Sequence, residues 1–445
     1  MLAASAARER VRGVRGENFW GKPRGKLDKA PQILQAATKG MAELTVLELG
    51  SDPRERGILH GRRMRGEIRE NLATYLERFE AGGAKPRAVL EQSEAWGAFI
   101  ARDHPEYAEE MAGIAAGAEL SLTEIALLNA RYELTYGVFG AEAQSVNRSV
   151  LEQEGCTSFG LLPEMTAEGH TLLGENWDWL QKVRGRVFIM RVKRSSEPGP
   201  EPGSEPGKGK PDFVGFTEAG IAGCKIGVNA AGIGLCVNGL VTRRDGLNGL
   251  RKPFHVRCRE ILDAWTFDKA LLPVVQTDRC CSANFLIGHA EGEIIDIEAT
   301  PDYCSYLYPE NGVVTHANHL MSETRIASEF ERIAPHSLYR AHRLERLLRH
   351  SGGEIGIDTI HTLLSDHFSA PASICRHPDT TLPEPKRVIS VTAAAVDLSA
   401  RTLYITDGPP CQSDFQVVPL YPSAAANDPA LFTNNAALTS NAKGL

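Results

Sequence analysis

The chain has 445 residues, of which 42% are hydrophobic and 24% are charged, and its formal net charge is −7. This composition is typical of globular proteins with a large core, and the negative balance argues against nucleic acid as a partner. No apolar run approaches the roughly 20 residues of a membrane span, and the basic N-terminus lacks the apolar block of a signal peptide. We therefore expect neither a membrane partner nor secretion.

The nine cysteines are distributed unevenly, since none precedes residue 156. They lie at positions 156, 224, 236, 258, 280, 281, 304, 375 and 411. An odd number without a CxxC pair is typical of a reduced intracellular protein, in which most thiols are small buried groups. We expect a cytoplasmic location. A peroxisomal one is the alternative, but the terminal Lys443-Gly444-Leu445 lacks the basic middle residue of that signal.

Three segments have compositions that do not favour a packed structure. Residues 1–40 are rich in Arg, Lys, Gly and Ala and are expected to form a disordered leader, and residues 423–445 a flexible tail. The stretch "SSEPGPEPGSEPGKGKP" at 195–211 cannot bury apolar area. Because strand-like sequence flanks it, we expect it to be a disordered insertion at the tip of a hairpin.

Residues 54–140 are predicted to be mainly helical. Pro105 stands at a plausible first helical position, and Ser121 and Glu124 have the spacing of a capping box. Further helices are expected near 253–274, over 337–350 and after 356. The apolar face of the helix over 337–350 would consist of Leu338, Ala341, Leu344 and Leu348.

From Cys156 onward the chain is rich in predicted strands. The segments are 157–163, 170–179, 186–194, 212–219, 223–229, 232–239, 283–290, 293–300, 388–396 and 402–408. Asn229 to Gly232 forms a turn between two of them. Strands and helices in separate blocks favour an α+β fold with sheets covered by helices.

The first cysteine follows Gly155 and precedes two hydroxyl residues. A single cysteine is most often a buried structural thiol, but Gly155 leaves the carbonyl before Cys156 accessible to attack. An α-amino group, with a pKa of ~7.7–8.0, is a general base at cellular pH. Cys156 could use its own amine only after cleavage of the bond to Gly155. This reasoning divides the chain into a helical pro-segment or light subunit, 41–155, and a catalytic subunit, 156–422.

Several stretches occur in the order of a known family. They are "DPRERGILHGRRMRGEI" (52–68), "EEMAGIAAGAELSLTEIALLNARYEL" (109–134), "GCTSFG" (155–160), "GENWDW" (174–179), "TEAGIAGCKIGVNAAGIGLCVNGL" (217–240), "THANHL" (315–320) and "DHFSAPASICRHPD" (366–379). With them the chain resembles the acyl-coenzyme A:isopenicillin N (6-aminopenicillanic acid) acyltransferase family, cysteine members of the N-terminal-nucleophile hydrolases. The resemblance implies a four-layer αββα sandwich, self-cleavage before Cys156, and acyl transfer or amide hydrolysis.

The resemblance also implies roles for individual residues. Asp178 would orient the Cys156 ammonium, and Asn318 would donate its amide to the oxyanion. Asn238 is a second oxyanion candidate, although an Asn-Gly pair is also an ordinary turn.

Two more residues match the family pattern. Arg376 would lower the pKa of the thiol, although a lone arginine is more often a solvated charge. Ser158 matches a hydroxyl residue that could assist cleavage.

No metal or nucleotide cofactor is expected. His316 and His319 flank Asn318, but a zinc site needs three or four ligands, and no CxxC or HExxH accompanies the pair. His60 and His367 are interpreted as structural. No phosphate-binding glycine motif is present, so acyl-CoA would enter only as a substrate.

The expected partners are a small-molecule acyl donor and an amine or water acceptor. With a β-lactam amine as acceptor, the protein would be a penicillin side-chain acyltransferase. With water, it would be an amide hydrolase for N-acyl amino acids or β-alanyl amides. A binding protein without catalysis is a further alternative, and a Cys–His protease is disfavoured because no histidine has a protease signature.

Overall fold

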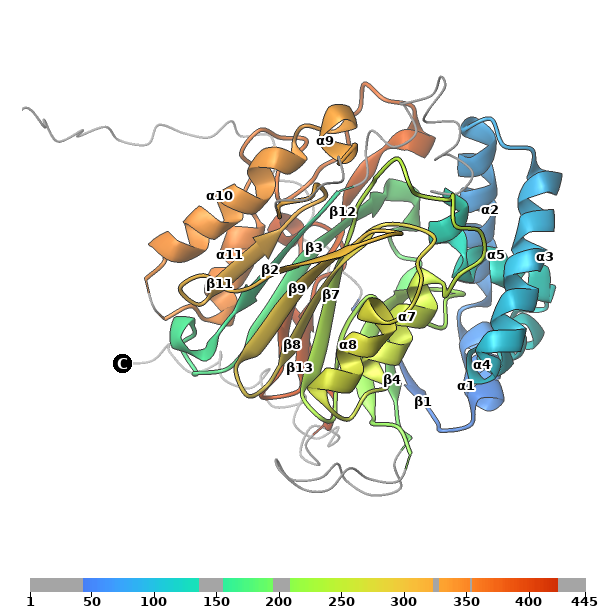
Figure 1. Ribbon diagram of the computed structural model, residues 1–445, viewed down its shortest axis with the longest axis horizontal. Coiled ribbons are helices and arrows are strands. Elements are labelled where there is room, and N and C mark those ends of the chain that lie inside the picture. The colour runs from blue at the N-terminus through green and yellow to red at the C-terminus, as the bar shows by residue number, and fades with distance from the viewer. Residues whose placement is uncertain (1–42, 136–154, 195–208, 323–327, 353, 423–445) are drawn as a thin grey trace, which may run out of the picture. The chain divides into compact units, whose positions relative to one another are not determined.

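Two sheets lie face to face at the centre of the computed structural model (Figure 1). The structure describes residues 43–135, 155–194, 209–322, 328–352 and 354–422. The expected leader, the expected tail and most of the expected insertion lie outside these ranges. Residues 209–211 of that insertion are described, and Lys210 forms ion pairs with Glu106 and Asp263.

The first sheet has eight strands in the order β1-β4-β5-β6-β7-β8-β9-β10. β1 and β4 are parallel and the other neighbours are antiparallel. Their bounds are β1 Val46–Leu49, β4 Val187–Val192, β5 Phe213–Glu218, β6 Ile226–Asn229, β7 Ile233–Gly239, β8 Ala283–His289, β9 Glu293–Ala299 and β10 Cys304–Leu307. The antiparallel pairing of β4 with β5 is the hairpin expected around the Pro/Gly-rich insertion.

The second sheet has six antiparallel strands in the order β11-β2-β3-β12-β13-β14. Their bounds are β2 Gly155–Leu161, β3 Leu172–Leu180, β11 Val313–His316, β12 Val388–Asp397, β13 Thr402–Ile405 and β14 Gln416–Pro419. Every residue of β2, β3 and β12 is buried. Strands covered on both faces are expected at the centre of a layered fold.

Helices cover the outer face of each sheet (Figure 1). α7 (Phe254–Leu262) and α8 (Phe267–Val275) pack on the eight-stranded sheet. α10 (Ser337–His350) and α11 (Ile357–Leu364) pack on the six-stranded sheet, and the short α9 (Phe330–Ile333) precedes them. The fold is therefore the αββα sandwich of the N-terminal-nucleophile hydrolases, as the resemblance implied.

The N-terminal segment adds a block of helices beside this sandwich (Figure 1). They are α1 (Pro53–Arg63), α2 (Arg65–Ala81), α3 (Pro86–Asp103), α4 (Pro105–Ala118) and α5 (Leu122–Asn129). α1 and α4 touch through their backbones, because a Cβ atom at Gly57 would lie 2.2 Å from the Glu110 carbonyl oxygen. Only glycine permits so close an approach.

Several local predictions are confirmed and some are wrong. Pro105 begins α4, and Ser121 and Glu124 form the capping box that starts α5. Leu338, expected on the buried face of α10, is 47% exposed, because it lies at the edge of that face, whereas Ala341, Leu344 and Leu348 are buried as expected. The sequence analysis also missed four short strands, β1, β10, β11 and β14. None of the helices described is long and apolar enough to cross a bilayer.

Candidate active site

Cys156 lies at the beginning of β2, opposite Trp177 on β3. Because side chains alternate along a strand, β2 and β3 offer two different faces. Cys156, Ser158 and Glu175 face the eight-stranded sheet, where they meet β7. Gly155 and Asp178 form the next pair and face the helices that cover the six-stranded sheet. The bond between Gly155 and Cys156 therefore lies between two polar environments.

The Cys156 thiol reaches a small cavity of about 30 Å³ between the two sheets. Trp177, Lys225 and Asn318 are among its lining residues. A cavity of this size has room for about one water molecule. An acyl chain can therefore enter only after side chains of the lining move.

Asn318 holds the backbone nitrogen of Cys156. The Cys156 N–H donates to Asn318 Oδ1 over 2.9 Å, and Asn318 Nδ2 donates to the Gly239 carbonyl over 3.0 Å. An amide NH₂ has two hydrogens, so one N–H of Asn318 is not needed by Gly239. The structure thus brings together two of the residues that the sequence analysis chose.

A buried carboxyl group that the sequence analysis did not choose lies on the same face of the sheet as the Cys156 thiol. It belongs to Glu175, whose Oε2 accepts from the Val237 N–H over 3.0 Å. Burial raises the pKa of Glu175 to about 8. Burial is the largest cause that raises the pKa of the Cys156 thiol, and the charges of Glu175 and Asp178 raise it further. In the uncleaved chain these shifts favour the thiol form, and the lowering of the thiol pKa expected from Arg376 stays a prediction.

Arg340 of α10 connects the nucleophile strand to Asn318. The side chain is completely buried. Its guanidinium donates to the Cys156 carbonyl, to Thr157 Oγ1 over 2.7 Å and to Asn318 Oδ1 over 2.6 Å. These bonds fix both the strand and the acceptor of the Cys156 N–H.

The sequence analysis missed Glu175 and Arg340, although weak signals exist. Glu175 is an acidic residue in a strand that begins and ends with leucine and is buried throughout. Arg340 stands four residues before Leu344, which places it on the buried stripe of α10. A buried charge that is out of place in its pattern is itself a sign of a polar site.

Asp178 and Arg376 are linked through one serine. Asp178 Oδ1 accepts from Ser390 Oγ over 2.6 Å, and Ser390 Oγ accepts from the Arg376 N–H over 2.9 Å. Burial raises the pKa of Asp178 to about 7, although Arg376 and Arg340 oppose that shift. Asp178 Oδ2 has no hydrogen-bond partner among the described residues.

Gly155 lies against the two guanidinium groups. A Cβ atom there would lie 2.6 Å from Arg376 Nη1 and 3.1 Å from Arg340 Nη2. Arg376 Nη1 is buried and lacks a hydrogen-bond partner in the described part of the chain. Gly155 is therefore required for the close packing of cations around the bond before Cys156.

Ser158, two residues after Cys156 on β2, forms a second polar pair with Asn238 of β7. Ser158 Oγ donates to Asn238 Oδ1 over 2.7 Å, and Asn284 Nδ2 reaches the same oxygen over 3.2 Å. Asn238 Nδ2 is buried without a described partner. It is an available donor, as an oxyanion site requires.

The histidines weighed as zinc ligands have other partners. His316 Nε2 lies 3.0 Å from Glu298 Oε1, and His319 Nδ1 lies 2.9 Å from Ser337 Oγ. His60 Nε2 accepts from the Gly220 N–H over 3.0 Å. In the described ranges, these three histidines belong to no group of potential metal ligands.

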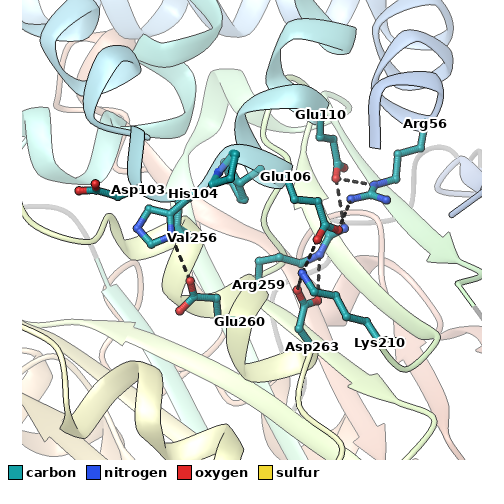
Figure 2. A pocket seen from close by; sticks show the side chains of 12 residues that line it. Arg56, Asp103, His104, Glu106, Glu110, Lys210, Val256, Arg259, Glu260 and Asp263 are labelled. Carbon is teal, nitrogen blue, oxygen red and sulfur yellow. Dashed lines mark hydrogen bonds and ion pairs between the residues drawn. The ribbon is translucent and has the colours of Figure 1, made fainter. Parts of the chain in front are cut away.

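A larger cavity of about 300 Å³ lies between α4 and α7 (Figure 2). Charged side chains line it, and they pair with one another. Arg56 contacts Glu106 and Glu110, and Lys210 contacts Glu106 and Asp263. The cavity contains no cysteine and no unpaired charge among its lining residues. We therefore assign the chemistry to the smaller cavity at Cys156.

A family described as acyl-coenzyme A:6-aminopenicillanic acid acyl-transferase matches residues 165–410. The chain belongs to this family. The 40 kDa form of acyl-coenzyme A:6-aminopenicillanic-acid-acyltransferase from Emericella nidulans is 30% identical over 331 residues. That match covers 73% of this chain and 82% of the relative.

Solved structures of amide hydrolases are also similar to this member of the acyltransferase family. A mutant conjugated bile acid hydrolase from Clostridium perfringens is 11% identical and covers 59% of this chain and 92% of its own, with a TM-score of 0.38. The Caenorhabditis elegans ortholog of N-acylethanolamine-hydrolyzing acid amidase is 13% identical and covers 55% and 93%, with a TM-score of 0.38. Penicillin V acylase from Agrobacterium tumefaciens is 12% identical and covers 57% and 83%, with a TM-score of 0.37.

Proposed function

We propose that this chain cleaves itself between Gly155 and Cys156 and then transfers or hydrolyses acyl groups with Cys156 as its N-terminal nucleophile. Membership of the acyltransferase family supports an acyltransferase or amide hydrolase. One observation carries the finer proposal: the Cys156 nitrogen is already bound by Asn318, while the thiol opens into the cavity. The nitrogen that would become the free amine is thus already held in place before the peptide bond is cleaved.

Cleavage would proceed by an N-to-S acyl shift. The Cys156 sulfur attacks the Gly155 carbonyl carbon, the C–N bond breaks, and the thiol proton passes to the departing nitrogen. Glu175 faces the same side of the sheet as Cys156, and because burial raises its pKa to about 8, it can carry that proton. Water then hydrolyses the thioester, which leaves a Gly155 carboxylate and a Cys156 with a free thiol and a free amine.

The new α-amine would serve as the general base of acyl transfer. Its nitrogen stays within reach of Asn318 Oδ1, and Asp178 Oδ2 offers a buried acceptor nearby. The amine takes the thiol proton as sulfur attacks the acyl carbon, and returns it to the leaving group. Water or an acceptor amine then attacks the acyl-enzyme and releases the thiol.

The negative oxygen of each tetrahedral intermediate needs N–H donors. Two buried side-chain groups are available to donate: the second N–H of Asn318, and Nδ2 of Asn238, which has no described partner. Arg340 would hold Asn318 in its orientation. Arg376 and Ser390 would position Asp178, and Ser158 would position Asn238.

The name of the Emericella nidulans relative points to an acyl-CoA donor and to 6-aminopenicillanic acid as acceptor. We propose transfer of this kind as the first function. Hydrolysis of N-acyl or β-alanyl amides is the second, because the same acyl-enzyme reacts with water. No other cofactor takes part in either scheme.

The test compares the wild type with Cys156→Ala, and Cys258→Ala serves as a control at another buried thiol. Each protein receives acyl-CoA donors with and without 6-aminopenicillanic acid, and N-acyl amides. Aminolysis and hydrolysis products are measured separately, and acyl groups on Cys156 are sought by mass spectrometry. We expect activity and the acyl-enzyme to vanish only in Cys156→Ala. Turnover by Cys156→Ala, or a wild type that transfers no acyl group, would contradict the proposal.

A further inference from the structure

Four side chains with metal-binding atoms converge beside β12. They are His367, Cys375, His377 and Cys411, and their ligand atoms all lie within 4.8 Å of one another. His377 Nε2 lies 3.0 Å from His367 Nε2, 3.6 Å from Cys375 Sγ and 3.3 Å from Cys411 Sγ. A tetrahedron with Zn–N bonds of ~2.0–2.1 Å and Zn–S bonds of ~2.3 Å has N···N and N···S edges of ~3.3 and ~3.6 Å. The observed separations are close to these edges.

These atoms cannot satisfy one another by hydrogen bonds alone. His377 Nε2 has three neighbours but carries at most one hydrogen. Both cysteines are free thiols. A cation that accepts a lone pair from all four atoms accounts for the whole arrangement.

We propose that His367, Cys375, His377 and Cys411 bind one zinc ion. Two imidazoles and two thiolates are a donor set that selects zinc over magnesium, calcium or manganese. Four protein ligands fill a tetrahedron and leave no position for a reacting water, so the site is structural. The sequence analysis expected no metal and a structural His367, because Cys411 is 34 residues from His377 and no CxxC marks the set.

The ion would join two segments that carry little other structure. The loop that ends at His377 is folded by the Cys375 N–H, which donates to the Asp366 carbonyl over 3.0 Å, and by the His377 N–H, which donates to the Pro371 carbonyl over 3.2 Å. Cys411 belongs to the short 3₁₀ turn Pro410–Gln412, which packs on β12 and α11. Zinc would tie this turn to the loop.

The site also holds the arginine nearest to the cleavage bond. Arg376 lies between two of the ligands, and its guanidinium packs against Gly155. The zinc would therefore position Arg376. This consequence rests on the proposed self-cleavage, whereas zinc binding itself does not.

Zinc binding is measured on the full chain carrying Cys156→Ala, so that the result does not depend on cleavage. The reduced protein is incubated with zinc, desalted and analysed for metal, and a second sample receives Co²⁺. We expect one zinc per chain, and cobalt absorption bands of a tetrahedral site with thiolate ligands. Less than about a tenth of an equivalent of zinc, together with no such bands, would overturn the proposal.

Cys411→Ser removes a ligand that is exposed, so the core is not altered. Cys304→Ser, at a partly buried thiol outside the cluster, is the matched control. We expect Cys411→Ser to weaken zinc binding by about 100-fold or more and Cys304→Ser to leave it unchanged. Equal zinc binding by both variants would show that the metal binds at another place and would contradict the proposed site. If Cys411→Ser does not fold, the cobalt spectrum of the parent decides the question.

The positioning role is tested with Cys411→Ser in the chain that retains Cys156. We expect slower cleavage between Gly155 and Cys156, and recovery of the rate in Cys411→His, which restores a ligand. Zinc binding with an unchanged cleavage rate in Cys411→Ser would reject the positioning role but keep the metal site.

Discussion

The two cavities described above differ in how the buried charges around them are paired. Around the cavity of Figure 2, each charged side chain lies within ion-pair distance of an opposite charge. At Cys156, the lining cations Arg131 and Lys225 pair with Glu218, but four other buried ionisable groups form no ion pair in the described part of the chain. They are Glu175, Asp178, Arg340 and Arg376.

This difference separates stability from chemistry. A buried charge without a close counterion is costly, and such groups persist mainly where function needs them. The cavity of Figure 2 joins α1 and α4 to α7, so its ion pairs hold the N-terminal helices on the sandwich. We expect substitutions there to change stability, and substitutions at Cys156 to change cleavage and turnover.

The largest effect is expected from Gly155→Ala. The new methyl group would displace the guanidinium of Arg376, because the two would lie 2.6 Å apart. Self-cleavage should be abolished, as measured by gel electrophoresis of the purified chain over time. Gly66→Ala, where the added methyl group meets no atom within 4 Å, is the control and should cleave normally. Normal cleavage of Gly155→Ala would show that the packing of cations at this bond is not required.

In the other cavity, Glu110→Gln should destabilise the fold without affecting chemistry. Glu110 is buried and accepts from both Arg56 and Arg259, so its loss removes the anion that these two buried cations share and leaves each with one acidic partner. Removing one partner of a buried pair costs about 3–5 kcal/mol, which urea denaturation would measure. Glu91→Gln, in an exposed pair with Arg87, should cost less than about 1 kcal/mol. A cleavage rate lowered by Glu110→Gln in folded protein would break the distinction between the two cavities.

The donor of the oxyanion site is identified by comparing Asn318→Asp with Asn238→Asp. Asn318→Asp keeps an oxygen for the Cys156 nitrogen but removes the N–H donors. In cleaved enzyme, loss of an oxyanion donor should lower kcat about 10²–10³-fold. We expect this loss in Asn318→Asp and a smaller one in Asn238→Asp. Unchanged kcat in both variants would place the oxyanion elsewhere.

A smaller effect is expected from the buried pair of Glu298 and His316, which lies outside both cavities. Burial acts to raise the pKa of Glu298, but the hydrogen bond and charge of His316 lower it to about 2 from 4.5. Burial acts to lower the pKa of His316, but Asp296 and Glu298 raise it to about 9 from 6.5. The carboxylate contributes stability above pH 4.5 and loses it as the pH falls through 2. The imidazolium contributes below pH 6.5 and loses it as the pH rises through 9.

The stability difference between the wild type and Glu298→Gln should therefore be largest between pH 4.5 and 6.5. Its size should be on the order of 2 kcal/mol. Glu293→Gln, at an exposed position on the same strand, should show no such window. A difference that does not vary between pH 3 and 9 would show that the pair is not ionised in the native state.

The sequence predicted an α+β fold because its helical and strand-rich segments are long and well separated, and the αββα arrangement came from the resemblance. It selected Asn318, Asp178 and Arg376 through the resemblance, and the structure brings them to Cys156. It could not find Arg340 or the pairing of Arg376 with Gly155, since both depend on contacts between residues far apart in the chain. Cys411 was missed for the same reason.

The wrong placement of Leu338 has a local cause. Ala341, Leu344 and Leu348 are buried as predicted, but Leu338 lies at the edge of their face. Arg340 is buried beside them through its hydrogen bonds to Thr157 and Asn318. A pattern of apolar residues alone cannot show that a charged residue belongs to the buried face of a helix.

The most direct test determines the N-terminal sequence and mass of the polypeptides in fully active protein. We predict one polypeptide that begins Cys156-Thr157-Ser158 and another that ends at Gly155, with both remaining together on size-exclusion chromatography. Activity should rise in proportion to the fraction cleaved. Full activity in protein whose bond between Gly155 and Cys156 is intact would contradict the account.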